Sequence, residues 1–503
     1  MVIVKHPFIK LMKKTNCSTF PRTCAEPFAS SMVESFRAIG YNIETAVADI
    51  VDNSISASAK NIWINFNWNG SETWISIKDD GHGMNNEELI QAMRLGSKNP
   101  MEERISTDLG RFGLGLKTAS FSQCRQLTVI SKKKDEQPVF WTWDLDFVQQ
   151  TDKWELIHYL PDPFFEKEIN ALESGTIVIW NEFDRYLKNK LKDDQKALNK
   201  FQILMEQVKR HLAMVFHRFI ESGDINLWCW NRLVEPWNPF LAKEMATQSF
   251  PEEFLFNSKI PVKGFVLPHK SKLSEELFKS MEGTKGWNEH QGFYVYRNER
   301  MLLSGDWLGM FRKEEHYKLA RIQVDVPSTF DSDWQIDIKK SVARPPLSLQ
   351  EQLKAYAMKV RAQAVEVYRH KGKSVRHLPG QKFIPLWIDH KRGDKWFYKI
   401  NRNHPLIEQI NTEAITEPDK AIERLISYIE ETIPTKSIYI KEAEEPESQG
   451  KPFEGLDMEP IRIAMKQMFY NLTHYGKSPE VAKSIILNTE PFNHFSYLLE
   501  FLD

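Results

Sequence analysis

The stretch Glu44-Thr-Ala-Val-Ala-Asp49-Ile-Val-Asp-Asn53 decides the fold that we expect for this chain. Four apolar residues recur in it at helical spacing and predict one buried stripe: Ala46, Val47, Ile50 and Val51. Asp49 and Asn53 stand four residues apart, so on a helix their side chains share a face, one turn from each other. A polar face beside an apolar stripe is typical of a functional site.

Three further pieces follow this helix in a fixed order. The first, Trp74-Ile-Ser-Ile-Lys-Asp79-Asp-Gly81-His-Gly83-Met84, reads as a strand that ends at Asp79, after which two glycines let the backbone approach another group closely. Residues 94–100 form a loop by composition. The third, Leu109-Gly110-Arg-Phe-Gly113-Leu-Gly115-Leu-Lys117-Thr118, places glycines before a helix, and such a helix N-terminus can bind an anion.

The glycines of the last piece raise the alternative of a P-loop. In that motif a lysine directly follows the second glycine, whereas here Leu116 separates Gly115 from Lys117. A P-loop also follows a buried strand, and the sequence places none directly before Gly110. The spacing therefore disfavours a P-loop.

Taken together, these pieces resemble the GHKL ATPases, the Bergerat-fold family of gyrase, MutL, histidine kinases and ninety-kilodalton heat-shock chaperones. In that family a helix carries an acidic residue four positions before an Asn, as Asp49 and Asn53 stand here. An Asp-x-Gly-x-Gly turn and a flexible lid follow, matched by Asp79 to Gly83 and by residues 94–109. A Gly-x-x-Gly-x-Gly turn and a later Gly-Thr strand complete the pattern. They are matched by Gly110, Gly113, Gly115 and the pair Gly175-Thr176.

The resemblance implies that this region binds ATP with Mg²⁺. Asp79 would accept a hydrogen bond from the exocyclic amine of adenine, where guanine presents a carbonyl, and Thr176 would reach the same edge through water. Because an unpaired buried carboxylate is costly, we also expect ordered water around Asp79. The Asn53 oxygen would be the protein ligand of Mg²⁺, which prefers oxygen ligands and keeps several waters.

The phosphates would lie against backbone N–H groups at the start of the helix that follows the glycines. Lys117 or Lys98 would add positive charge there. The residues that we expect at the nucleotide are Asn53, Asp79, Gly81, Gly83, Met84, Ser97, Lys98, Gly110, Gly113, Leu114, Gly115, Leu116, Lys117 and Thr176.

Asp49 is the predicted catalytic carboxylate that orients or deprotonates the attacking water, a role worth about 10²–10⁴-fold in rate. Relatives usually carry Glu at this position, and Asp is shorter by one methylene, roughly 1.5 Å of reach. A misplacement of that size can cost about 10²-fold. The sequence therefore predicts an ATPase that turns over slowly.

Composition sets broad limits on the rest of the chain. Its 503 residues predict two to four domains, and its net charge of −1 gives no general attraction to nucleic acid or membrane. Four cysteines without a C-x-x-C pair give no support for a zinc or redox motif. No stretch approaches the roughly 18 apolar residues of a membrane span, and the N-terminus lacks a signal-peptide pattern, so we expect a cytoplasmic protein without membrane contact.

We expect an α+β chain in which a Bergerat-type α/β sandwich is followed by a transducer-like α/β domain and a mainly helical C-terminal region. The expected parts are an N-terminal arm (1–30), the ATP-binding domain (31–190), the transducer-like domain (191–350), a helix with a small basic and aromatic unit (351–440), an acidic linker (441–452) and a helical element (453–503).

Within these parts we predict one helix over residues 186–222, loops over 151–174, and strands over 225–230 and 292–303 that both belong to the second domain. The phrase at residues 296–300, Tyr-Arg-Asn-Glu-Arg, resembles the second domain of MutL and MORC ATPases.

In such relatives a Lys or Arg of the second domain touches the γ-phosphate. Lys340 is the first candidate for this catalytic contact and Lys339 the second, with a surface lysine pair as the alternative. The basic and aromatic residues of 381–404 can hold nucleic acid or form a small β unit with exposed lysines, and the second reading is favoured.

The function that these observations favour is an ATPase that forms a homodimer when ATP closes the lid. The dimer would act as a clamp or switch, with DNA as a candidate partner. By analogy with bacterial relatives, companion proteins of an antiphage or restriction-type defence system are further candidates. Two alternatives remain, a nucleotide-dependent binding module with little hydrolysis and a chaperone.

Overall fold

The computed structural model describes most of the chain between residues 25 and 369 and several shorter parts after it. The described residues are 23, 25–38, 40–96, 115–188, 190–255, 259–327, 330, 334, 344–369, 386–392, 395–405, 407, 426–431, 433, 435 and 457–502. Contacts between residues divide the chain into two compact units, Met1–Lys371 and Gly372–Asp503. The residues of the predicted acidic linker and most of the predicted N-terminal arm lie outside the described residues.

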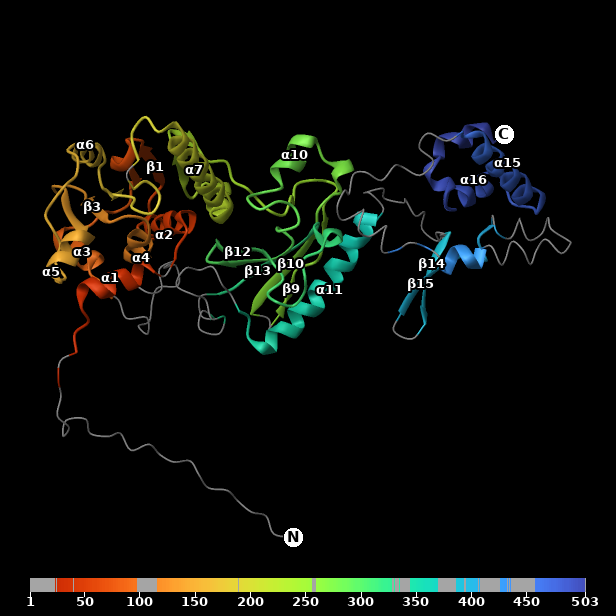
Figure 1. The fold of residues 1–503 in the computed structure, drawn as a ribbon. Coiled ribbons are helices and arrows are strands. Elements are labelled where there is room, and N and C mark those ends of the chain that lie inside the picture. The colour runs from red at the N-terminus through yellow and green to blue at the C-terminus, as the bar shows by residue number, and fades with distance from the viewer. Residues whose placement is uncertain are drawn as a thin grey trace, which may run out of the picture. The chain divides into compact units, whose positions relative to one another are not determined.

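The first unit begins with a mixed sheet in which helices cover both faces (Figure 1). Its strands lie in the order β4-β3-β5-β2-β1-β6-β7. They are β1 (Asn61–Asn67), β2 (Trp74–Asp79), β3 (Gln126–Lys132), β4 (Val139–Asp144), β5 (Gly175–Asn181), β6 (Asn226–Cys229) and β7 (Arg232–Leu233). The helices of this region are α1 (Ala29–Arg37), α2 (Ile43–Ser56), α3 (Asn86–Met93), α4 (Gly115–Gln123), α5 (Leu145–Thr151) and α6 (Phe164–Asn170), with a single 3₁₀ turn at η2 (Gly70–Glu72) between β1 and β2.

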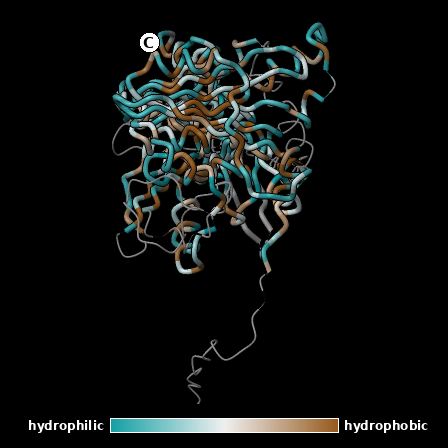
Figure 2. The backbone as a smooth tube through the Cα atoms, turned by 90° about the vertical axis from the view of Figure 1, so that its left-hand side faces the viewer, coloured by the Kyte–Doolittle hydropathy of each residue, from teal (hydrophilic) through white to brown (hydrophobic). Residues whose placement is uncertain are grey.

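Strand β5 shows why both faces of this sheet are covered. Its side chains alternate, so that Val178 and Trp180 join the core that contains α2 and α4, whereas Ile177 and Ile179 join a second cluster beneath α6. Figure 2 shows hydrophobic segments running through the strands, with mostly hydrophilic segments outside them. The α/β sandwich that the sequence predicts is therefore present.

Helix α2 forms as the apolar spacing predicts. The Asn42 side chain caps its N-terminus by accepting a hydrogen bond from the Thr45 N–H at 3.0 Å. The four apolar residues of the predicted stripe are all buried. The packing of this stripe fixes the helix that carries the polar residues Asp49 and Asn53.

A second sheet follows in the order β12-β11-β13-β10-β8, with β9 also paired to β10. Its strands are β8 (Gln248–Ser249), β9 (Glu253–Phe254), β10 (Ile260–Val266), β11 (Gly292–Arg297), β12 (Arg300–Asp306) and β13 (Ala320–Asp325). Helix α11 (Leu347–Arg369) packs against β10 and β13, and α7 (Gln195–Val215) contacts both α2 and β12. The remaining elements are α8 (His217–Glu221), α10 (Glu275–Ser280), η3 (Lys270–Lys272) and η4 (Glu315–Tyr317).

Several local predictions were wrong in informative ways. Strand β6, expected in the second domain, pairs parallel to β1 in the first sheet. The strand expected over 292–303 is a hairpin, because Asn298 and Glu299 both adopt positive φ, of 47° and 65°, and turn the chain. Residues 186–222 contain two helices, α7 and α8. Residues 151–174 are mostly loop, as expected, with the short helix α6 among them.

The second compact unit contains a β hairpin and a small helical cluster. Strands β14 (Trp387–Arg392) and β15 (Lys395–Ile400) pair antiparallel, which is the small β unit favoured above. Helices α15 (Glu459–His474) and α16 (Pro479–Leu487), with 3₁₀ segments η6 (Phe492–His494) and η7 (Ser496–Phe501), share an apolar core that includes Met465 and Ile486. The α+β class predicted from the sequence is confirmed. Across the described residues, none of the helices combines the length and the apolar character that crossing a membrane requires.

Candidate functional site

Helix α2 carries the first two residues of the site in different environments. Asp49 is 3% exposed, and the Tyr41 hydroxyl donates a hydrogen bond to its Oδ2 at 3.0 Å. Asn53, one turn further on, is exposed. The helix therefore presents an anchored carboxylate beside an accessible amide, as the sequence predicts for a catalytic group and a metal ligand.

Asp79 ends strand β2 and is 5% exposed. The Ser54 hydroxyl donates to its Oδ2 at 2.8 Å, and the Gly81 N–H donates to its Oδ1 at 2.9 Å. Burial raises the pKa of Asp79 above its ordinary value, and these two hydrogen bonds oppose the rise. The protein itself thus supplies one hydrogen-bond donor to each oxygen of the carboxylate.

Thr176 lies directly opposite Asp79, because the two are register partners in the β2–β5 pair. Its hydroxyl is 2.8 Å from the Ser131 Oγ, and that oxygen also accepts the Met84 N–H at 2.9 Å. Ser131 therefore ties the predicted residues Thr176 and Met84 together. Our sequence reasoning missed it, because the pairing of β3 with β5 that brings it to Thr176 is a long-range contact.

The glycines of the Asp-x-Gly-x-Gly turn are required by close backbone packing. Gly83 has a φ of +65°, and a Cβ there would lie 1.9 Å from the Lys132 carbonyl oxygen. A Cβ at Gly81 would lie 2.8 Å from the Ala57 carbonyl oxygen at the end of α2. The turn is therefore pressed against both α2 and β3, and this contact brings it to the site.

Helix α4 begins at this site. A Cβ added to Gly115, its first residue, would lie 3.9 Å from the Asp49 Oδ2. Leu116 is half-buried against the core. Lys117 is 2% exposed, and its Nζ donates to the Ala92 carbonyl at 2.8 Å, at the end of α3. The remaining predicted residues, Ser97, Lys98, Gly110, Gly113, Leu114, Lys339 and Lys340, lie outside the described residues.

Arg300 is the main residue at the site that our sequence reasoning did not select. It comes from β12 of the second sheet, is 4% exposed, and donates from Nε to both carboxylate oxygens of Asp52 at 2.8 Å. Its Nη2 is 3.7 Å from the Asp49 Oδ1. The phrase at residues 296–300, which drew attention for its resemblance to other second domains, contains this arginine.

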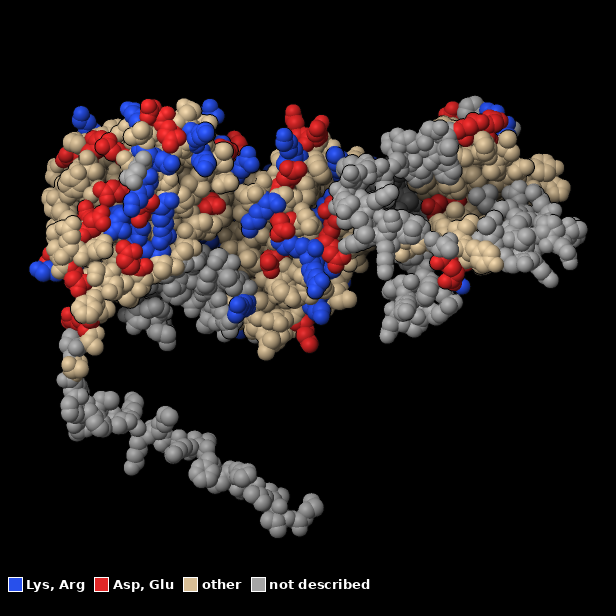
Figure 3. Space-filling view, in the orientation of Figure 1, with Lys and Arg blue, Asp and Glu red and all other residues tan. Residues whose placement is uncertain are grey.

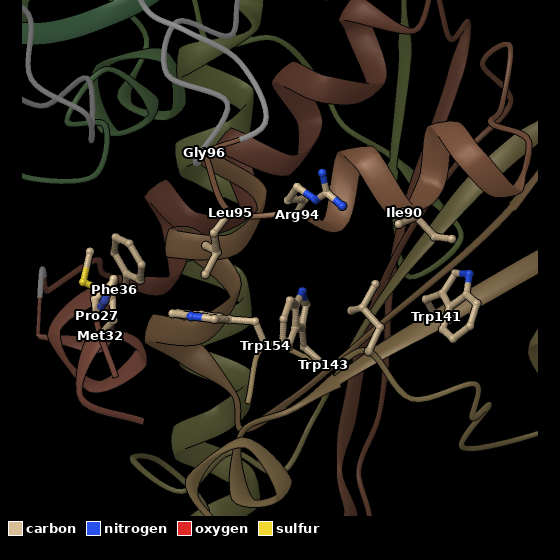
Figure 4. Close-up of a pocket in the computed structure, with 11 residues that line it drawn as sticks. Pro27, Met32, Phe36, Ile90, Arg94, Leu95, Gly96, Trp141, Trp143 and Trp154 are labelled. Carbon is tan, nitrogen blue, oxygen red and sulfur yellow. The ribbon is translucent and has the colours of Figure 1, made fainter. Parts of the chain in front are cut away.

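A separate apolar pocket of about 760 Å³ lies nearby (Figure 4). The close-up shows Trp143 and Trp154 side by side, with Phe36 and Met32 to one side of them. Its described lining residues are Pro27, Met32, Phe36, Ile90, Arg94, Leu95, Gly96, Trp141, Trp143, Trp154 and Leu156. This lining includes none of the residues predicted to touch the nucleotide.

Comparisons with known proteins agree with this geometry. Residues 41–176 match the family model described as "Histidine kinase-, DNA gyrase B-, and HSP90-like ATPase". The ATPase morc-1 of Caenorhabditis elegans is 35% identical over 89 residues, 18% of this chain and 10% of that protein. The DNA mismatch repair protein MutL of Dictyoglomus turgidum is 34% identical over 113 residues, 22% of this chain and 20% of that protein.

A wider and weaker match is the human structural maintenance of chromosomes flexible hinge domain-containing protein 1, 24% identical over 251 residues, 42% of this chain and 12% of that protein. The chain therefore matches at most 20% of the length of these relatives. Among solved structures, the ATPase and transducer domains of DNA topoisomerase II from Balamuthia mandrillaris align with 10% identity and a TM-score of 0.37, covering 66% of this chain and 86% of that one.

The family match spans α2, the Asp79 turn, the start of α4 and Thr176, which are the described parts of the site. Residues 41–176 are thus similar to the GHKL-type ATPases, and the resemblance identified from the sequence is confirmed. An α+β fold with a second sheet after this domain agrees with that class.

Proposed function

We propose that the chain binds Mg·ATP between α2, the Asp79 turn and the start of α4, and hydrolyses it slowly. The observation that carries this proposal is the convergence of three separate segments on one place. Asp49 lies beside Gly115, while Ser54, one residue after Asn53, donates to Asp79. Asn53 itself is exposed, so its amide is accessible to a ligand beside these buried carboxylates.

The described residues fit the nucleotide and its metal by their chemistry. Asp79 keeps an acceptor for an amine at a buried position, which favours adenine over guanine. The exposed Asn53 amide offers the kind of oxygen that Mg²⁺ prefers. When bound, the metal would neutralise phosphate charge. The N-terminus of α4 places backbone N–H groups and the positive end of the helix dipole toward the same place.

Asp49 is the residue that we assign to water activation. Its Oδ2 is held by Tyr41, and its Oδ1 faces the Arg300 guanidinium, so the carboxylate has a defined orientation. A carboxylate that is fixed in this way can orient a water molecule and accept its proton. Its short side chain limits that role, which is why we propose slow turnover.

Phosphate release by purified protein tests this role directly. We expect Asp49→Asn to reduce release by about 10²-fold or more, because an amide cannot accept the proton. Asp49→Glu restores the reach found in relatives, so it should match or exceed the wild type. Equal release by the wild type and Asp49→Asn at the background level would overturn the ATPase assignment.

We further propose that ATP binding drives formation of a homodimer that acts as a clamp or switch, with DNA as a candidate partner and a defence system as a candidate setting. The similarity to MutL, whose name denotes mismatch repair, supports the DNA part. Figure 3 shows Lys and Arg side chains gathered on one face of the ATPase domain, with Asp and Glu around them. Stimulation of turnover by double-stranded DNA, with a steep dependence on salt, is the expected result.

A second candidate function is a nucleotide-dependent binding module that hydrolyses little. The presence of Asp in place of the usual Glu favours this candidate. It predicts nucleotide affinity without phosphate release from either the wild type or Asp49→Glu. A chaperone function would instead appear as protection of client proteins from aggregation, without any effect of DNA.

A further inference from the structure

The side chain of Arg300 crosses from the second sheet to helix α2. It is 4% exposed, although a guanidinium is rarely buried without partners. Its Nε bridges both oxygens of Asp52 at 2.8 Å, its Nη1 donates to the Met301 carbonyl at 3.1 Å, and its Nη2 lies 3.7 Å from Asp49. One side chain of the second sheet therefore contacts two carboxylates of the helix that carries the candidate catalytic group.

The position of Arg300 is fixed by the hairpin that bears it. The two-residue turn Asn298-Glu299 has positive φ at both positions, the geometry of a tight hairpin with little freedom. Glu299 lies 3.1 Å from Arg218 of α8, and Arg218 also pairs with Asp325 of β13. The tip of the hairpin is therefore tied to α8 and, through Arg218, to β13.

The surroundings of this contact strengthen it. Asp49, Asp52 and Arg300 are each at most 4% exposed, so little water screens their charges. Two buried carboxylates on adjacent turns repel each other unless a cation lies between them. His211 of α7 does not supply that cation, because burial and the positive charges of Arg300 and Lys285 lower its pKa to about 3.

We infer that Arg300 is a positioning residue for the candidate catalytic carboxylate: by bridging Asp52 and facing Asp49, it lets the second domain set the orientation of Asp49. This inference rests on the proposed ATPase function and deepens it. A movement of the second sheet relative to α2 would separate Arg300 from Asp52 and release Asp49. Hydrolysis then depends on the second domain through the contact of Arg300 with Asp52 and Asp49, and the second domain acts without touching the nucleotide through this residue.

Steady-state kinetics of phosphate release, measured with the full chain, test this inference. We expect Arg300→Met to lower kcat by about 10- to 100-fold, the cost of a misplaced catalytic group, while KM for ATP changes less than about threefold. Arg300→Lys keeps the positive charge but not the planar guanidinium with its several N–H donors, so it should recover part of kcat.

Two companion variants separate positioning from folding. Arg300→Met combined with Asp52→Asn removes the unpaired buried charge, so it should restore the melting temperature but not kcat. Arg37→Met is the matched control, because Arg37 is similarly buried, at 3% exposed, and donates to both oxygens of Asp184, at 2.8 and 2.6 Å. Its other hydrogen bonds go to the Phe121 and Cys124 carbonyls at the C-terminal end of α4, and none of these contacts involves Asp49. Below its melting temperature this control should retain kcat.

Each result bears on the inference in a defined way. A wild-type kcat in the Arg300→Met/Asp52→Asn double variant would overturn the positioning role while leaving the ATPase function intact. An equal loss of kcat in the Arg37→Met control would also overturn it, since any buried arginine would then serve. If the wild type releases no more phosphate than Asp49→Asn, the proposed function fails and this inference fails with it.

Discussion

Asp79 shows how a single residue can be prepared for a ligand. It is almost fully buried, yet Ser54 and Gly81 each donate a hydrogen bond to one of its two carboxyl oxygens. Burial is the larger effect and raises its pKa. Its position at the end of β2 followed from the sequence pattern, and the family resemblance implied that Thr176 lies near it. Its donor Ser54 did not, since a serine in a helix carries no such signal.

The raised pKa of Asp79 predicts a pH-dependent stability difference. An Asp in the unfolded chain has a pKa of about 3.9. Above that pH the unfolded state releases the proton while folded Asp79 still holds it, and this stabilises the unfolded state relative to the folded one. The stability from Asp79 is therefore fully present below about pH 3.9 and is lost as the pH rises through the raised folded value. The Asp79→Asn variant does not lose stability in this way, because its amide side chain does not titrate. The melting temperature of the variant minus that of the wild type should be larger at pH 7.5 than at pH 4, and a difference that is constant with pH would contradict the assignment.

Among the elements, the turn after β2 shows most clearly why the site requires glycine at a particular position. Gly83 and Gly96 have nearly equal φ values, +65° and +67°, but only Gly83 would place a Cβ against backbone, at 1.9 Å from the Lys132 oxygen. The glycine spacing predicted this turn. The hairpin of β11 and β12 was not predicted, because Asn298-Glu299 lacks the glycine that usually marks such a turn.

The two glycines form a matched pair for mutation. Gly96→Ala should cost about 1–2 kcal/mol of unfolding free energy, the usual penalty for positive φ in a residue with a Cβ. Gly83→Ala should cost clearly more, because the Lys132 carbonyl must also move, and it should weaken ATP binding because the Asp79 turn shifts with it. Chemical denaturation measures both costs. Equal losses of stability in the two variants would show that the turn does not pack as described.

At the scale of the whole molecule, long-range contacts are what the sequence could not supply. Arg300 and Asp52 are 248 residues apart, and their pairing depends on how the second sheet meets α2. The same is true of β6, whose alternation predicted a strand but not its parallel partner β1. Local patterns thus identified the strand that ends at Asp79, the α2 helix and the Asp79 turn, whereas the contacts between sheets required the folded chain.

ATP-dependent association is the prediction that belongs to this scale. With a non-hydrolysable ATP analogue and Mg²⁺, light scattering should show the mass of the protein doubling, because the proposed switch closes as a dimer. Asn53→Ala should remain at the mass of the nucleotide-free protein, since it lacks the proposed metal ligand. An unchanged mass in the wild type at saturating analogue would argue against a clamp or dimer switch.

The most direct measurement is a calorimetric titration of nucleotide into the wild type and three variants. The wild type should bind Mg·ATP, and it should bind Mg·GTP at least about tenfold more weakly. That difference corresponds to the loss of one hydrogen bond, the one from the adenine amine to Asp79. Asn53→Ala and Asp79→Asn should lose most of the ATP affinity, whereas Asp325→Asn, in the second sheet, should keep it. Wild-type affinity for Mg·ATP in both Asn53→Ala and Asp79→Asn would contradict the proposed site.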